Sequence, residues 1–384
     1  MLLLQAHAVC EYKLLTNRHA EMGRVPVPPF VGSRLGDPAS PFIDHDGDLE
    51  IYGTGNEYLK YSSSETLTAA QSLILAAEPQ VLKVHLAYPG GALINEGLID
   101  ETPWDLAVEQ WPDENILYAG VMTPTADHVH AVFAEDNWNR RVFAFRMKNG
   151  IWMREPRPIT YPETKSWIGH SYGHQFIKDE NGQTWIFYER VMEEKESKPW
   201  ITGLFARKML TPFRSSKNEI KIFDPTNLPY AALNRQFGGK LVEGARPYRV
   251  SINGKNKFVI LFSSGDFPTN NYGINMAFSD QLLGPYQPAL NGDETDLKDF
   301  GKPLRNSGDF AWGPSRASLF YNSEGSAFIL FHAVRARLWP DFDFEHWPDF
   351  GSMPVYRDYF IAPVDFEAGT ENGVGIQMNF RCQP

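Results

Sequence analysis

Short runs of apolar residues, many of them alternating with polar ones, recur along the whole chain and are separated by Gly, Asn and Asp. Runs of about four to eight residues between such turn residues predict β-strands. One segment differs, because residues 64–83 are rich in Ala and Leu and begin with Ser64, a residue suited to cap a helix. We expect this helix to be an insertion into a scaffold made of strands.

Five similar modules of strands start near residues 37, 120, 172, 243 and 313. The steps between them are roughly 50 to 85 residues, and a four-stranded propeller blade needs about 40 to 50. The sequence therefore predicts an all-β fold, a five-bladed β-propeller with loop and helix insertions. We assign residues 1–30 to a short N-terminal extension and residues 31–384 to the propeller. A β-sandwich with insertions is the alternative, which five similar modules fit less well.

Composition narrows the classes of partner. The chain has 384 residues, of which 42% are hydrophobic and 22% charged, as is usual for a globular protein. Aromatic residues make up 14%, which suits either strands or a surface that packs against sugar rings. The formal net charge of −11 argues against nucleic acid and anionic membranes, because both attract basic surfaces. No apolar stretch is long enough for a membrane span.

The ends of the chain leave location and redox state open. The start, MLLLQAHAVCEYK, lacks the positive residues and the long apolar stretch of a signal peptide. We expect a cytoplasmic protein, or a secreted or periplasmic one whose leader was removed. Cys10 and Cys382 suit neither a disulfide framework nor a zinc site, so we expect free thiols, or one bridge if the termini meet. No cofactor is expected to be required, the sequence gives no support for an axial Ca²⁺ or Na⁺, and the oligomeric state stays open.

Two acids stand at equivalent points of the first and fourth modules. Asp37 precedes SPFIDHDGDLEIYGTG, and Glu243 precedes a strand-turn-strand run that ends in KFVILFSSG. Such carboxyl groups can face each other across an axis, which suits glycoside hydrolysis: one protonates the leaving oxygen and the other activates water. As the acid, Glu243 must hold a proton near neutral pH. The alternatives are a turn-forming Asp-Pro step and a salt-bridged strand glutamate.

Three modules resemble the five-bladed glycoside hydrolases of family 43, over roughly residues 30–366. GDPASPFIDHDGDLEIYGTG is similar to the family's first blade, VEGARPYRVSINGKNKFVILFSSG to its fourth, and WGPSRASLFYNSEGSAFILFHAVRARL to its fifth. The resemblance implies that Asp37 is the general base and Glu243 the general acid. It also places His332 at a characteristic histidine of the fifth blade.

The third and fifth modules depart from this pattern. The family's third blade carries an aspartate that tunes and orients the acid, whereas Tyr172 stands here, with His170 and His174 beside it. Arg316 replaces a histidine near the axial channel. The histidine-rich third module is compatible with the related family 117 of anhydro-galactosidases, thought to use a histidine acid. The propellers that cleave sucrose and fructans match less well, because Gly follows Glu243 and no Arg-Asp-Pro is present.

Further substrate-binding candidates are cationic or aromatic. Arg316 and Arg357 are candidates for clamping sugar hydroxyls or a carboxylate, Arg246 for binding substrate or for opposing protonation of the acid, and Trp312 for stacking on a ring. The alternative for Trp312 is a residue of the core. The His170 and His174 pair is expected either to assist the acid or bind a hydroxyl, or to be buried in the core. It lacks a third ligand, so no metal site is expected.

Two functions from different classes follow from the resemblance. The first is an inverting glycoside hydrolase that cleaves an arabinoside, xyloside or galactose-type bond in plant or algal oligo- or polysaccharides. The second is a propeller that binds carbohydrate without cleaving it, having lost the third-blade carboxylate. In either case the partner is a carbohydrate.

Overall fold

The computed structural model describes the chain in separate stretches. They are residues 9–10, 13–14, 42–43, 48–53, 57–62, 83–86, 93–94, 97–99, 116–124, 138–148, 151–160, 171–191, 202–223, 233–234, 239–240, 242–265, 273–289, 312–321, 325–334, 357–368, 376–380 and 382–383. All regular elements in these stretches are β-strands, which confirms the prediction of an all-β fold. The expected helix over residues 64–83 lies outside them, except for Lys83, which begins β6.

Five sheets correspond to the five predicted modules. In hydrogen-bonding order the first consists of β3 (Phe42–Ile43), β4 (Asp48–Gly53), β5 (Glu57–Ser62) and β6 (Lys83–Leu86). The second consists of β7 (Leu93–Ile94), β8 (Gly97–Ile99), β11 (Ile151–Arg154), β10 (Trp138–Lys148) and β9 (Ile116–Pro124). The third consists of β12 (Ser171–Lys178), β13 (Thr184–Val191), β14 (Thr202–Thr211) and β15 (Arg214–Phe223).

The last two sheets complete the series. The fourth consists of β18 (Glu243–Ile252), β19 (Lys255–Ser264), β20 (Gly273–Ser279) and β21 (Gln287–Pro288). The fifth consists of β2 (Lys13–Leu14), β24 (Arg357–Ala368), β23 (Ala327–Val334) and β22 (Trp312–Tyr321), with β25 (Ile376–Phe380) also paired to β24. A small separate pair joins β16 (Leu233–Asn234) to β17 (Gly239–Lys240).

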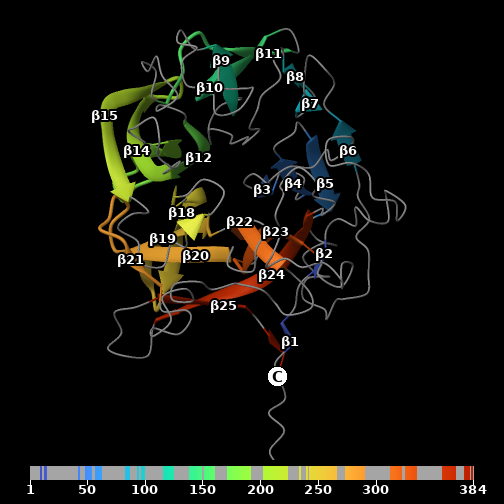
Figure 1. Ribbon diagram of the computed structural model, residues 1–384, viewed down its shortest axis with the longest axis vertical. Helices are drawn as coiled ribbons and strands as arrows, with labels where there is room; N and C mark the ends of the chain where they lie inside the picture. Colours follow the sequence, from blue (N-terminus) through green and yellow to red (C-terminus); the bar gives the residue numbers. More distant parts are fainter. Residues whose placement is uncertain are drawn as a thin grey trace, which may run out of the picture.

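The sheets follow one another around a common centre, with β3, β12, β18 and β22 on the inner side (Figure 1). The contacts agree with this order, since β9 touches β12, β12 touches β18, and β18 touches β22. Strands β12, β18 and β22 begin within one residue of three predicted module starts. The five-bladed architecture predicted from the sequence is therefore confirmed.

The core lies between neighbouring sheets, and β19 shows how the sequence creates it. Its run FVILF is continuously apolar, as expected for a strand that is buried on both faces. Because successive side chains point to opposite faces, Phe258, Ile260 and Phe262 pack against the third sheet. Val259 and Leu261 pack with the fifth. Strand β19 is therefore packed against a neighbouring sheet on each of its two faces.

The turn between β18 and β19 follows directly from its sequence. Asn253 and Gly254 have φ angles of 52° and 74°. Two left-handed residues in a two-residue hairpin loop form the turn that Asn-Gly favours. This turn sets the register of β18 against β19, and with it the place of Glu243 at the far end of β18.

Both ends of the chain reach the region of the fifth sheet. Strand β2, which belongs to the predicted N-terminal extension, pairs antiparallel with β24. Strand β1 (Val9–Cys10) pairs with β26 (Cys382–Gln383), and Cys10 stands opposite Cys382. The two cysteines are thus cross-strand neighbours, and the division of the chain at residue 30 stays a prediction. Within the described stretches no helix is long and apolar enough to cross a membrane.

Candidate functional site

The inner strands of the third, fourth and fifth sheets begin with the same irregularity. The pairing register shifts within residues 172–175 of β12, 243–246 of β18 and 312–318 of β22. The shifts at 172–175, 243–246 and 315–318 each contain a residue with a left-handed backbone, and the φ angles are 59° at Gly173, 61° at Gly244 and 51° at Arg316; β22 has a further shift at 312–315. A bulge of this kind bends the strand and re-aims the side chains next to it.

The repeated bulge defines equivalent positions in the three sheets. Each left-handed residue is preceded by Tyr172, Glu243 or Ser315, and these pair with Glu189, Ser263 and His332 on the second strand. The predicted acid Glu243 therefore occupies the same place as Tyr172 in the third sheet. The cross-strand partners lie beside the bulges, and all three of them are fully buried.

Glu243 is the half-buried first residue of β18. Its neighbour Gly244 packs against Arg316, so that a Cβ on Gly244 would lie 2.5 Å from Cδ of Arg316. Only glycine leaves room for the arginine stem while also adopting this φ without a steric penalty. The glycine that follows Glu243 thus lets the start of β18 pack closely against the fifth sheet.

Arg316 is nearly buried, with 9% of its surface exposed. Its backbone N–H donates a 2.8 Å hydrogen bond to Oγ of Ser263. A left-handed φ is unusual for a residue with a Cβ, and such strain gathers at functional sites. The backbone of Arg316 is thus hydrogen bonded to the fourth sheet, and its side-chain stem packs against Gly244, the neighbour of the predicted acid.

Arg246 is also buried, with 1% of its surface exposed. Its guanidinium donates through Nη1 to Oγ of Ser318 on β22. Gln175 of β12 donates a 3.1 Å bond to the carbonyl of Pro247. These contacts tie the start of β18 to the sheets on both sides, so Glu243 is carried on a rigid element.

His332 is the fourth predicted residue that the structure brings into this region. It is fully buried on β23, and its Nε2 is hydrogen bonded to Oγ of Ser315. Ser315 directly precedes Arg316 in the bulge of β22. The histidine is therefore placed to support the bulge that carries the arginine.

A carboxylate that the sequence reasoning did not single out lies next to Glu243. Glu189 of β13 is fully buried, and its Oε1 accepts a 2.6 Å hydrogen bond from the N–H of Ala245. It stands opposite Tyr172. Position 172 carries no carboxylate because it is a tyrosine. Glu189, which pairs with Tyr172 from the next strand, provides one. The signal in the sequence is a glutamate that directly follows the largely apolar run WIFY of β13.

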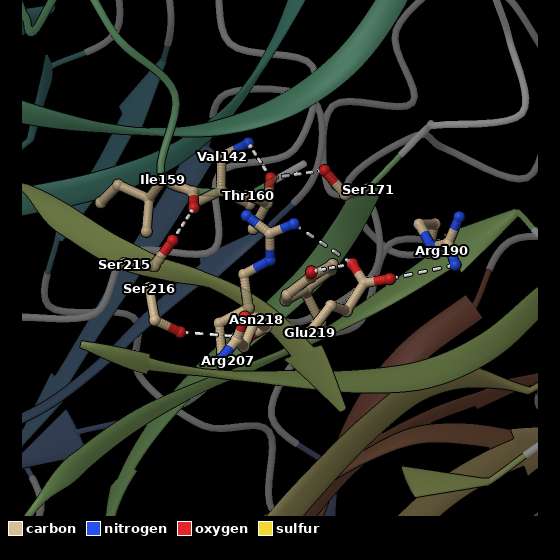
Figure 2. Close-up of polar contacts among 11 residues, drawn as sticks. Val142, Ile159, Thr160, Ser171, Arg190, Arg207, Ser215, Ser216, Asn218 and Glu219 are labelled. Carbon is tan, nitrogen blue, oxygen red and sulfur yellow. Dashed lines mark hydrogen bonds and ion pairs between the residues drawn. The ribbon is translucent and has the colours of Figure 1, made fainter. Parts of the chain in front are cut away.

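His174 and the start of β12 are held from the second sheet. The ring of His174 is fully buried and meets Phe176 edge-on at 6.1 Å between centroids. Just before it, the hydroxyls of Ser171 and Thr160 are 2.5 Å apart, and Thr160 accepts a 3.0 Å bond from the N–H of Val142. Figure 2 shows Thr160 and Ser171 turned toward each other. This buried chain of bonds fixes where the third inner strand begins.

A second polar group in the third sheet involves strands β13, β14 and β15. Glu219 of β15 lies between Arg190 and Arg207, at 3.0 Å and 3.7 Å (Figure 2). Tyr188 also donates to the carboxylate of Glu219. Burial, and then the nearby carboxylate, raise the pKa of Tyr188 well above its usual value. This group stabilises the outer part of the sheet, away from Glu243.

Several predicted site residues lie partly or wholly outside the described stretches. Asp37 and His170 are not among the described residues. For Tyr172, Trp312 and Arg357 the structure describes the backbone alone: Trp312 and Arg357 begin their strands and both stand opposite Val334. The roles expected for all of these residues stay predictions.

The described part of the site combines opposite charges, most of them buried. Glu243 is half-buried at the start of β18, and the residues that support this end of the strand and the neighbouring bulge include the buried Glu189, Arg246, Arg316 and His332. A partly exposed carboxyl group in such a polar setting suits proton transfer to a bound ligand. No group of three or more potential metal ligands occurs among the described residues.

Comparison with known proteins gave matches at the level of structure. No model of a known protein family matches the sequence, and neither does any curated protein. A thermostable family-43 glycoside hydrolase has a TM-score of 0.55 at 14% identity, over 93% of this chain and 97% of the other. The α-L-arabinofuranosidase from Lactobacillus brevis has a TM-score of 0.54 at 13% identity, over 91% and 94%.

A third solved structure is similar over nearly the same length. The α-L-arabinanase from Cellvibrio cellulosa, in complex with arabinohexaose, has a TM-score of 0.51 at 12% identity, covering 90% of this chain and 96% of its own. At such identities the likeness concerns the fold. The chain thus has the fold of the family-43 glycoside hydrolases.

Proposed function

We propose that this protein is a glycoside hydrolase in which Glu243 is the general acid and Asp37 the general base. The observation that carries the proposal is the setting of Glu243. Glu243 is half-buried and begins the inner strand β18, and the left-handed glycine that follows it packs against buried Arg316. A residue so placed can contact a bound ligand and transfer a proton to it.

The solved structures of similar fold support the substrate class. Two of them are an α-L-arabinofuranosidase and an α-L-arabinanase bound to arabinohexaose. We therefore place arabinosides first among the proposed substrates, ahead of xylosides and galactose-type sugars. The aromatic content of the chain, 14%, supplies rings on which sugars can stack.

We propose that the reaction inverts the configuration at the anomeric carbon. In this scheme Glu243 protonates the leaving oxygen while Asp37 removes a proton from the attacking water. An inverting pair needs a separation of about 6.5–9.5 Å to leave room for this water. The scheme requires no cofactor, so we expect that a chelator leaves the rate unchanged.

Hydrolysis of a panel of aryl glycosides tests the proposal. We expect the wild type to cleave an aryl α-L-arabinofuranoside, and Glu243→Gln and Asp37→Asn to lower kcat/KM by at least about 10²-fold. Proton NMR of the first product formed should show the inverted anomer. If the wild type and Glu243→Gln share the same trace rate, the hydrolase assignment fails. Binding of arabino-oligosaccharides without cleavage would then identify a carbohydrate-binding propeller.

A further inference from the structure

Glu189 lies where the third and fourth sheets meet, and its hydrogen bond reaches the strand of Glu243. The bond runs from the N–H of Ala245 to Oε1 of Glu189 at 2.6 Å. Ala245 is two residues beyond Glu243, so this N–H lies within roughly 7 Å of the Cα of Glu243. A carboxylate binds a backbone N–H more strongly than a neutral acceptor does. The bond therefore restrains the backbone that presents the proposed acid.

The backbone of the third sheet is shaped around the same carboxylate. A Cβ on Gly173 would lie 2.8 Å from Oε1 and 3.0 Å from Oε2 of Glu189. Gly173 also has a left-handed φ of 59°, which glycine adopts readily. The bulge in β12 thus brings its backbone into direct contact with the Glu189 carboxylate, which is held between two inner strands.

The fourth sheet shows that a smaller group can do the purely structural part of this task. Ser263 holds the position equivalent to Glu189, and its hydroxyl accepts the N–H of Arg316 in the next sheet at 2.8 Å. A neutral hydroxyl is therefore enough to join one sheet to the next. Burying a carboxylate costs free energy. The third sheet nevertheless buries Glu189, and it does so beside β18, the strand that contains Glu243.

We infer that Glu189 is a positioning residue for Glu243, an inference that rests on the proposed hydrolase function. Its carboxylate fixes the Glu243–Ala245 backbone against the third sheet and keeps the acid directed at the bond to be cleaved. The contacts on which this depends come from the second strand of the third blade. Tyr172, on the first strand, is not needed for this role.

Kinetics of two Glu189 variants test this role on the full-length protein. We expect Glu189→Ala to lower kcat by about a hundredfold with little change in KM, as a misplaced catalytic group does. Glu189→Gln keeps an amide oxygen that can accept from Ala245, so it should recover about tenfold of that loss. Hydrogen exchange at the Ala245 amide should be faster in the Ala variant than in the Gln variant.

Glu219→Ala is the matched control, because it removes a carboxylate from the same sheet with its contacts to Tyr188, Arg190 and Arg207. It should lower Tm and leave kcat unchanged when assayed below Tm. Wild-type kcat in Glu189→Ala, or an equal loss in Glu219→Ala, would overturn the positioning role alone. If the Ala variant does not fold, an unchanged kcat in Glu189→Gln overturns it. A wild type that cleaves no glycoside overturns both the role and the proposed function.

Discussion

Gly244 and Arg316 are packed so closely that a Cβ on the glycine would lie 2.5 Å from Cδ of the arginine. This contact joins the inner strands of the fourth and fifth sheets directly beside Glu243. It requires the arginine stem and the absence of a side chain on the glycine at the same time. Changes at either residue should therefore affect both the stability of the fold and the proposed reaction.

Gly244→Ala should destabilise the protein more than the same change at Gly254. Both glycines have a left-handed φ, 61° and 74°, so both substitutions carry the same backbone penalty, about 1 kcal/mol. A Cβ on Gly254 would meet nothing within 4 Å, whereas one on Gly244 must displace Arg316, adding about 1–3 kcal/mol. Urea unfolding of the two variants measures the difference. Equal losses would show that the close contact with Arg316 does not constrain position 244.

Arg316→Gly and Arg316→Ala should separate stability from activity. Both remove the guanidinium, and we expect both to lose glycosidase activity by tenfold or more, the rate equivalent of one charge-assisted hydrogen bond. Only glycine relieves the left-handed backbone, φ 51°, so the Gly variant should be more stable than the Ala variant by about 1–2 kcal/mol. Steady-state kinetics with denaturant unfolding gives both quantities. A more stable Ala variant would mean that position 316 is not strained.

Tyr188 should make stability fall at alkaline pH. Burial and the Glu219 carboxylate raise its pKa in the folded protein well above 10, while the unfolded chain loses this proton near pH 10. The contribution is therefore complete below pH 10 and is lost above it, by about 1.4 kcal/mol per pH unit. Tyr188→Phe should be less stable at neutral pH and fall less steeply between pH 10 and 11.5. If the free energy of unfolding falls equally steeply with pH in the two proteins over that range, Tyr188 does not have the raised pKa.

Cys10 and Cys382 should cross-link under oxidising conditions. Their strands pair antiparallel with the two residues opposite each other, and cross-strand Cα separations of about 4.5–5.5 Å suit a disulfide. The bridge would close nearly the whole chain, and in the chain-entropy account this adds up to about 5 kcal/mol. Intact mass and thiol titration before and after oxidation detect it. Cys10→Ser is the control, and an oxidised wild type with two reactive thiols contradicts the prediction.

Much of the fold could be predicted from the sequence because its signals are local. A few residues are enough to predict the conformations of the Asn253-Gly254 turn and of the apolar run in β19. Since the modules repeat, the inner strands of the third, fourth and fifth blades could be located to within a residue. Glu243 was identifiable for the same reason, because it opens one such strand.

The rest depends on contacts that no short segment encodes. The register of Glu189 opposite Tyr172 includes a bulge, and its bond to Ala245 crosses from one sheet to another, so the strand sequence TWIFYERV does not reveal it. The left-handed backbone of Arg316 has no sequence signal, since glycine is the residue expected there. The pairing of Cys10 with Cys382 requires both ends of the chain to be placed first.

The pairing of β2 with β24 also has a consequence for synthesis. Residues 13 and 14 leave the ribosome long before their partner strand at residues 357–368. The fifth blade therefore cannot be completed until the other four blades have been translated, and contacts this distant in sequence form slowly. A nascent chain stalled after the fourth blade would carry an unpaired edge, which is a substrate for chaperones and a risk for aggregation.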